Sequence, residues 1–437
     1  MDSSADASVE KGKGGRAADE RLLRWIGATP ILGASVFSKL SVPPFGGMGI
    51  SIVIPLISAA SALGLVAGKM VVDVPRFIAY AIAMSVLWGT QALRGESFSV
   101  LSLLMLSVVH FPYVLRLNPL PDYARLLDWF VKLALVVGIL GLVQFSAQFV
   151  VGPGPAFPIE SYMPSQLKVA LFNPFTHLQY GSPYYRANGV VMLEPSFFSQ
   201  FLAVAMVVEM LTRMRWAVLA TLIAAIIVSY SGTGLVLVAV AVPLILMSKG
   251  RWDVLIVGAA AVILVLVAAS FADVVFVRVF FARAGEFSAT GSSGFARFVG
   301  GFYLFEQFLW PDPLRTLFGF GAGTVDDFKA LANVPVSGTS IFFKMVFEFG
   351  LVGATAYFGF LACCFHRSRA PGLLKFVLVL TYALGGIYIP FSHALVFGLV
   401  LWPVSADPRG SAALADETPR RPPSPEKFDK RLSEVSA

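Results

Sequence analysis

Long apolar stretches follow one another along most of the chain, and this pattern limits the possible folds more than any other feature. A helix needs about 20 apolar residues to cross a bilayer. Twelve stretches reach or approach that length: 25–41, 48–68, 77–93, 98–115, 129–151, 195–212, 216–230, 232–248, 253–273, 340–363, 373–389 and 391–404. Inside a bilayer every backbone N–H and C=O must be hydrogen-bonded within the protein, which favours helices. The sequence therefore predicts an all-α polytopic membrane protein with about 12 transmembrane helices between residues 25 and 404.

Charged residues are few and unevenly placed. Of 437 residues, 57% are hydrophobic and 14% are charged, whereas soluble domains have about 45–50% and about 25%. Residues 1–24 and 405–437 carry 22 of the 59 charges, with equal numbers of each sign. We expect these two ends to be disordered tails. The net charge of +7 therefore belongs to the apolar body, where an excess of Lys and Arg reflects the membrane and its headgroups and not a nucleic-acid partner.

The Lys and Arg residues of the short connections predict the orientation in the membrane. With a cytoplasmic N-terminus, the outer short connections carry only Arg94, with Lys39 at the end of a span, and the cytoplasmic connections carry ten basic residues. The ten are Lys69, Arg76, Arg116, Arg125, Arg213, Arg215, Lys249, Arg251, Arg367 and Arg369. An even number of spans places both termini in the cytoplasm. The two long connections 152–194 and 274–339 then face outward, and connections of this length commonly carry specificity and chemistry.

The second long connection contains a segment with helical periodicity, 295–310. Its apolar residues recur every three or four positions: Phe295, Phe298, Phe302, Leu304, Phe305, Phe308 and Leu309. This spacing predicts an amphipathic helix that lies at the outer interface or covers the end of the helix bundle.

Arginines in the two long connections are the strongest candidates for chemistry. Arg186 follows Tyr184 and Tyr185 just before the sixth span, and Arg297 and Arg283 lie in the second long connection. A guanidinium group binds phosphate oxygens with two parallel hydrogen bonds and keeps its charge. We therefore expect a clamp for a diphosphate built from both connections, with contact to lipid headgroups as the alternative role.

Glu194 is the candidate carboxylate of the same region. It stands eight residues after Arg186 and directly before Pro195, which we expect to be the first residue of the sixth helix. The sequence leaves two roles open for Glu194: a carboxylate that stabilises the helix start, or a general base.

Ionisable residues inside predicted spans each need a partner or a function. Lys344 and Glu348 stand four residues apart and share one helix face, where they form an ion pair or present Lys344 to an anionic headgroup. Glu209 and Arg213 have the same spacing, and we expect a structural ion pair there.

The sequence predicts neither a metal site nor a cofactor. We expect His110 and His393, each alone in an apolar stretch, to be hydrogen-bonded packing residues, and His177 has no ligand partners nearby. Cys363 and Cys364 are adjacent, which suits neither a disulfide framework nor a metal site. There is no phosphate-binding loop of the ATPase type.

Two glycine-containing turns stand at 231–234 (SGTG) and 319–323 (GFGAG). Neither follows a strand, so neither is a dinucleotide-binding motif. We expect the SGTG turn to let the chain reverse or to let two helices approach closely.

Four segments in order along 180–400 resemble the O-antigen and exopolysaccharide polymerases (Wzy-type) and the related O-antigen ligases. They are RANGVVMLEPSFFSQFL (186–202), SYSGTGLV (229–236), ARFVGGFYLFEQFLWPDPLRTLFGFGAG (296–323) and TSIFFKMVFEFGLVG (339–353). Within them, the Arg-led Glu-Pro segment, the S-x-S-x-T-G-like turn, the G-x-G-x-G segment and the E-x-G-x-x-G segment resemble the family patterns.

The resemblance implies a membrane-embedded glycosyltransferase fold (GT-C-like) in the bacterial inner membrane. It implies transfer of a growing glycan from undecaprenyl diphosphate onto a lipid-linked repeat unit, without metal or ATP. The implied catalytic residues are Arg186, Glu194 and Arg297, and the implied substrate-binding residues are Tyr184, Tyr185, Arg283, Lys344 and Glu348. The implied partners are the undecaprenyl-diphosphate-linked oligosaccharide, membrane lipid, a flippase and a chain-length regulator.

The chain departs from the ligase pattern at two places. Thr339 stands where ligases have a histidine, and the SGTG turn lacks the arginine that is often found there. Both departures favour a polymerase. A ligase or another lipid-linked glycan transferase, and a secondary transporter of an anionic solute, remain the alternatives.

Overall fold

The computed structural model describes residues 3–42, 50–94, 98–169, 172, 175–178, 182–271, 295, 299–332 and 339–404. The fold is all-α, as predicted. The longer helices are α1 (Ser3–Ser35), α2 (Val53–Val66), α3 (Val74–Arg94), α4 (Val100–His110), α5 (Tyr123–Ala147), α8 (Pro195–Leu211), α9 (Trp216–Val228), α10 (Gly232–Ser248), α11 (Trp252–Phe271), α17 (Ile341–His366) and α18 (Gly372–Leu384). The shorter ones are η1 (Phe111–Val114), α6 (Pro153–Ala156), α7 (Pro158–Tyr162), η2 (Ser165–Leu167), α14 (Gly300–Leu304), η4 (Phe305–Leu309), α15 (Pro313–Phe318), α16 (Val325–Leu331), α19 (Pro390–Val396) and η5 (Phe397–Leu401).

Two short antiparallel strand pairs tie connections together. The strand β1 (Ser41–Val42) pairs with β2 (Ile50–Ser51), and β3 (Met70–Val72) pairs with β4 (Leu115–Leu117). Each pair lies in connections between helices, so the strands do not alter the all-α class.

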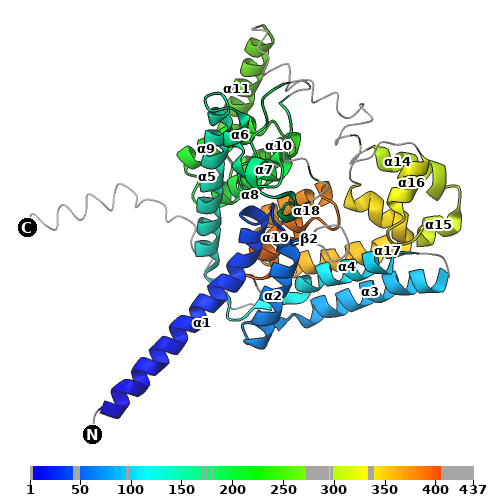
Figure 1. The fold of residues 1–437 in the computed structure, drawn as a ribbon, viewed down its shortest axis with the longest axis horizontal. Helices are drawn as coiled ribbons and strands as arrows, with labels where there is room; N and C mark the ends of the chain where they lie inside the picture. The colour runs from blue at the N-terminus through cyan, green and yellow to red at the C-terminus, as the bar shows by residue number, and fades with distance from the viewer. Residues whose placement is uncertain are drawn as a thin grey trace, which may run out of the picture.

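The helices form two groups joined by α18 and α19 (Figure 1). In the first group α5, α8, α9 and α10 pack against one another, and in the second α17 packs along α3. The second group runs across the direction of α5 in this view. The helix α18 contacts α8 and α10 of the first group and α17 of the second, so it connects the two.

Two helices among the described residues, α5 and α17, are long and apolar enough to cross a membrane. Shorter apolar helices lie in eight of the other expected spans: Val53–Val66, Val100–Val114, Pro195–Leu211, Trp216–Val228, Gly232–Ser248, Trp252–Ala261, Gly372–Leu384 and Pro390–Leu401. The helix α1 begins at Ser3, within the segment 1–24 that we expected to be a tail. The other expected tail, 405–437, lies outside the described residues.

The GFGAG turn has a packing role against α17. At Gly350 the helix is broken by a backbone conformation of φ 66° and ψ −174°. Across this break Phe320 N–H donates to Phe347 O (2.8 Å) and Gly321 N–H donates to Glu348 O (2.9 Å). A Cβ at Gly319 would lie 2.4 Å from the Glu348 backbone, so the close approach requires glycine.

The SGTG turn allows a close helix approach, but between α10 and α8 rather than between the two spans that the turn connects. A Cβ at Gly234 would lie 2.5 Å from the backbone oxygen of Ser199 in α8. Gly234 N–H donates to Ser199 Oγ (3.2 Å), which holds α10 against α8.

The amphipathic helix expected at 295–310 is present over its described part, as α14 followed by the π-helical η4. Leu304, Phe305 and Leu309 are buried. The Phe302 and Phe305 rings lie edge-on to the ring of Phe343, 4.9 and 5.3 Å between centroids, so the segment packs on the beginning of α17.

Candidate functional site at the start of α8

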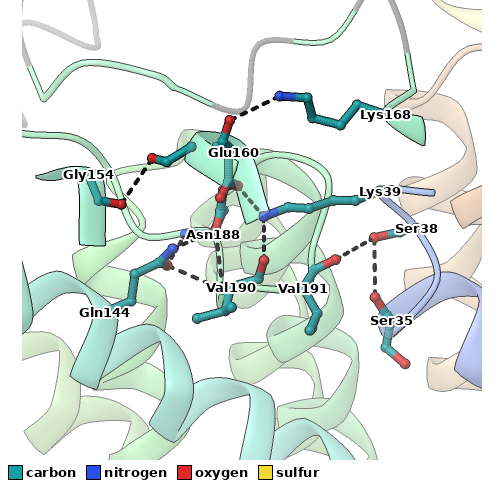
Figure 2. A network of polar contacts seen from close by, with 11 residues as sticks. Ser35, Ser38, Lys39, Gln144, Gly154, Glu160, Lys168, Asn188, Val190 and Val191 are labelled. Atoms are coloured by element: carbon teal, nitrogen blue, oxygen red, sulfur yellow. Dashed lines mark hydrogen bonds and ion pairs between the residues drawn. The ribbon is translucent and has the colours of Figure 1, made fainter. Parts of the chain in front are cut away.

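A buried polar network surrounds the segment that leads into α8 (Figure 2). Its members are Lys39, Gln144, Glu160 and Asn188, which come from four separate parts of the chain. The ammonium group of Lys39 forms an ion pair with Glu160, and the two side chains are 5% and 1% exposed. Asn188 Nδ2 donates to the same carboxylate oxygen of Glu160 (2.7 Å). A buried ion pair is stable only when further hydrogen bonds satisfy its atoms, and Asn188 provides one.

Gln144, near the end of α5, holds the backbone of this segment. Its Oε1 accepts from the N–H groups of Asn188 (3.0 Å) and Val190 (3.3 Å), and its Nε2 donates to Asn188 Oδ1 (3.0 Å). The amide of Gln144 therefore pairs with both the backbone and the side chain of Asn188. Near its end, α5 thus carries a side chain that fixes the position of residues 188–190, here called the 188–190 turn.

The 188–190 turn contains backbone strain. Gly189 has φ 68° and Val190 has φ 66°. A positive φ suits glycine, whereas for a β-branched residue it is a genuine outlier that costs about 1–3 kcal/mol. The Val190 carbonyl accepts from Lys39 Nζ, and its N–H donates to Gln144 Oε1 and Asn188 Oδ1. The polar network therefore holds Val190 in a conformation that the residue would otherwise avoid.

Further contacts attach the chain around Lys39 to the first long connection. Ser38 Oγ donates to Val191 O (3.1 Å), and Val169 N–H donates to Lys39 O (3.1 Å). Lys168 Nζ donates to the backbone carbonyl of Glu160 (2.9 Å). The end of the first expected span and the connection 152–194 thus form one structural unit.

Arg186 lies two residues before this turn and is half-buried. Its N–H donates to Thr176 O (2.9 Å), and Nη2 makes a long hydrogen bond to Leu178 O (3.4 Å). Its Nε is buried and has no hydrogen-bond partner among the described residues. The guanidinium group therefore keeps donor capacity for an anionic ligand.

Tyr184 and Tyr185 belong to an aromatic cluster beside Arg186. The Tyr184 ring lies 4.6 Å from that of Phe149, and the Tyr185 ring lies 5.6 Å from Phe157 and 4.7 Å from His177. Gln148, the residue after the end of α5, holds the backbone of Tyr185. Its Nε2 donates to Tyr185 O (3.0 Å), and its Oε1 accepts from Tyr185 N–H (2.8 Å). Such rings offer flat apolar faces of the kind on which sugars stack.

Glu194 is the residue before the first residue of α8, and Pro195 begins the helix as predicted. Its side chain does not accept from the first backbone N–H groups of α8, and its Oε2 accepts instead from Ser196 Oγ (3.0 Å). The backbone carbonyl of Glu194 receives Phe198 N–H (3.0 Å). The carboxylate is half-buried, at the same end of α8 as the 188–190 turn.

Lys344 and Glu348 form the ion pair that was one of the two expected alternatives, at 2.8 Å. Glu348 is fully buried and also accepts from Val325 N–H at 3.5 Å. Lys344 lies 5.6 Å from the ring of Tyr388. The described contacts of this pair join α17 to α16 and to Tyr388, and none of them reaches Arg186.

Arg297 and Arg283, the second half of the expected clamp, lie outside the described residues. The contribution of the second long connection to the diphosphate clamp therefore stays a prediction.

The expected pair of Glu209 with Arg213 is wrong. Arg215 binds Glu209 with two hydrogen bonds, Nε to Oε1 at 2.9 Å and Nη2 to Oε2 at 2.7 Å. Arg213 pairs instead with Asp128 in α5 at 3.0 Å. The helix α8 ends at Leu211, so the chain after it turns back and presents Arg215, not Arg213, to the buried carboxylate.

His110 and His393 are hydrogen-bonded packing residues, as expected. His110 Nδ1 donates to Leu106 O (2.8 Å), and its Nε2 lies within hydrogen-bond distance of the hydroxyls of Tyr357 (2.7 Å) and Tyr382 (3.0 Å). His393 donates through Nε2 to Ile387 O and accepts through Nδ1 from Tyr113, both at 2.8 Å. Within the described part of the chain, no group of three His, Cys, Asp or Glu side chains is placed to hold a metal ion.

The sequence reasoning missed Gln144, Glu160 and Asn188 and treated Lys39 only as a charge at the end of a span. A signal existed. Glu160 is the single acidic residue between Asp128 and Glu194, and Lys39 is the single charged residue between Arg24 and Lys69. Solitary opposite charges in apolar surroundings need a partner, and each is the partner of the other.

Comparison with known proteins adds no family assignment. No model of a known protein family matches this chain, and no curated protein is significantly similar to it. The fold and the site together define a helical protein that carries apolar helices of membrane-spanning length and a buried polar centre at the start of α8.

Proposed function

We propose that this protein is a membrane glycosyltransferase, a polysaccharide polymerase of the bacterial inner membrane. It transfers a growing glycan from undecaprenyl diphosphate onto a lipid-linked repeat unit in exopolysaccharide or O-antigen synthesis. The observation that carries the proposal is Arg186, in the segment that resembles the polymerases. It is a half-buried arginine beside an aromatic cluster, and its Nε has no hydrogen-bond partner among the described residues.

We propose about 12 spans with both termini in the cytoplasm, arranged as in the GT-C-like glycosyltransferases. Contacts between connections support this sidedness. Segments expected inside contact one another, as in the ion pairs Lys69–Asp19 (2.8 Å) and Arg367–Asp73 (3.1 Å). Segments expected outside do the same, as in the Lys39–Glu160 pair and the hydrogen bond from Ala187 N–H to Val228 O (3.2 Å).

The proposed reaction uses the groups at the start of α8. Glu194 takes the proton from the acceptor hydroxyl, whose oxygen attacks the anomeric carbon of the donor glycan. A new glycosidic bond forms while the bond from that carbon to the diphosphate oxygen breaks. Arg186 stabilises the negative charge that develops on the leaving diphosphate, with Arg297 as the proposed second cation. The anomeric phosphate bond supplies the free energy.

The aromatic cluster would bind the sugars and the exposed apolar helices would contact lipid. Tyr184 and Tyr185 stand beside Arg186, so they are placed to stack on the sugar nearest the diphosphate. Trp216 on α9 and Ile256 and Leu264 on α11 are among the exposed apolar residues that suit a lipid environment. A flippase that supplies the lipid-linked unit and a chain-length regulator are the proposed partners.

Deletion of the protein tests the proposal against its nearest alternative. A polymerase requires that cells without it accumulate single repeat units on undecaprenyl diphosphate, measured by mass spectrometry of extracted lipids. Full-length polymer retained on the lipid would indicate a ligase instead. An unchanged lipid-linked pool would contradict both and favour a transporter.

A further inference from the structure

The 188–190 turn stands between the two groups to which the proposed function assigns chemistry. Arg186 precedes the turn by two residues, and Glu194 follows it by four. The relative position of the guanidinium and the carboxylate therefore depends on the backbone course of this turn. Reacting groups must be held closely, because a misplacement of about 1 Å costs about 100-fold in rate.

The turn does not adopt its course by its own preference. Val190 is a β-branched residue with φ 66°, a conformation that persists only where the surroundings over-determine it. The surroundings here are Gln144 on the N–H of Val190 and Lys39 on its carbonyl oxygen. Figure 2 shows Lys39 reaching both this carbonyl and the Glu160 carboxylate.

The Lys39–Glu160 pair is buried more deeply than a structural surface pair would be. The side chains are 5% and 1% exposed, and Glu160 Oε2 is buried without a hydrogen-bond partner among the described residues. Removing two charges from water costs free energy that a simple clamp between loops would not need, since apolar residues would pack there as well. The presence of a buried ion pair here is explained if the hydrogen bonds of Lys39 to Val190 and of Glu160 to Asn188 are needed to hold the backbone conformation of the turn.

We propose that Lys39 and Glu160 are positioning residues for the glycan transfer, acting through the 188–190 turn, an inference that rests on the proposed function. Lys39 orients the Val190 carbonyl, and Glu160 holds both Lys39 and the Asn188 amide. The pair thereby fixes Arg186 relative to Glu194. Neither residue touches the reacting atoms, and the strain at Val190 is the conformational cost of that arrangement.

The decisive variant is Lys39→Met, studied alone and together with Val190→Gly. Lys39→Met should lower kcat about 100-fold with little change in KM, because misplaced groups lose transition-state contacts before they lose substrate binding. The double variant with Val190→Gly should have a kcat about tenfold higher than Lys39→Met alone. Glycine adopts the positive φ without strain, so the turn no longer needs Lys39. The substrate in this assay is the lipid-linked oligosaccharide extracted from cells that lack the protein.

A matched control lies in the same loop. Lys168 donates to the backbone carbonyl of Glu160 and not to the 188–190 turn, so Lys168→Met should keep kcat near that of the parent protein. The double variant Lys39→Met with Glu160→Gln removes the unpaired buried carboxylate, so it tests the proposal if Lys39→Met alone folds poorly. It should also show the low kcat.

Hydrogen exchange on the purified protein separates this inference from the proposed function. Lys39→Met should accelerate exchange of the amides of residues 188–193, and Lys168→Met should not. If exchange accelerates while the deletion strain shows no lipid-linked intermediate, the proposed function fails and the role of Lys39 in the turn stands. Unchanged exchange and unchanged kcat in Lys39→Met would overturn the inference. Loss of kcat that Val190→Gly does not restore would also overturn it, because Lys39 would then act directly.

Discussion

At the scale of single residues, Arg186 is the group of the site that keeps donor capacity. Its buried Nε has no hydrogen-bond partner among the described residues, whereas the Glu194 carboxylate accepts from Ser196 Oγ. Groups committed to structure look different in the same molecule. Arg215 binds Glu209 with two hydrogen bonds of 2.7 and 2.9 Å, which leaves little capacity for a ligand.

Replacing Arg186 with alanine should nearly abolish polymer while the protein stays in the membrane. One charge-assisted hydrogen bond contributes about 1.5–3 kcal/mol, which corresponds to roughly a 10- to 150-fold lower rate if it acts in the transition state. Arg186→Lys should restore little, because a point charge cannot replace a planar fork. Polymer is measured by gel electrophoresis of extracts matched for protein level.

Arg125→Ala provides the control for Arg186, since Arg125 is 75% exposed and pairs with Asp122 at the start of α5. This variant should make polymer at the parental level. If Arg186→Ala also makes as much polymer as the parent protein, Arg186 does not bind the diphosphate, and its role is contact with lipid headgroups.

At the scale of elements, the break in α17 organises the second helix group. Gly350 has φ 66° and ψ −174°, a combination available to glycine alone, and the backbone of α15 passes directly against it. A Cβ at Gly350 would lie 2.3 Å from the backbone of Leu317. The same close approach brings the carbonyl groups of Phe347 and Glu348 to the GFGAG turn.

Gly350→Ala should destabilise the protein by at least about 1–3 kcal/mol, because alanine is strained in this conformation and the neighbouring backbone must move. Gly359→Ala is the matched control on the same helix, since a Cβ there meets nothing within 4 Å. Alanine at 359 should leave the stability equal or raise it by about 0.5–1 kcal/mol. Thermal unfolding in detergent, followed by tryptophan fluorescence, measures both. Equal unfolding temperatures for the two variants would show that the break at Gly350 is not tightly packed.

At the scale of the whole molecule, the question is which connections share a side of the membrane. Lys39 and Glu160 meet from two connections expected outside, and Asp73 and Arg367 meet from two expected inside. In each of these two pairs, both residues belong to connections that the positive-inside pattern assigns to the same side.

Cysteine labelling should confirm this sidedness. In a variant without Cys363 and Cys364, Ser165→Cys should react with a membrane-impermeant maleimide in intact cells. Asp253→Cys, on the 68% exposed Asp253 side chain beside Arg251, should react only after permeabilisation. Labelling of Ser165→Cys only after permeabilisation would contradict an outward site.

The sequence by itself determined the helical class and the start of α8. Apolar stretches of about 20 residues admit few structures other than helices, and Pro195 begins α8 because proline lacks the N–H that the first helical residue does not use. The periodicity of 295–310 likewise acts locally, so it could be interpreted without tertiary structure.

Only the tertiary structure decided which distant residues meet. Lys39 and Glu160 are 121 residues apart, and no local pattern relates them. Glu209 pairs with Arg215 because α8 ends at Leu211. Packing determines the position of this helix end to within one or two residues, and the sequence pattern does not. The strained conformation of Val190 is held by the side chains of Lys39 and Gln144, which only the folded chain brings together. Local periodicity predicts the elements because it is set by short-range sterics and burial, whereas the site is made by long-range contacts that the periodicity does not encode.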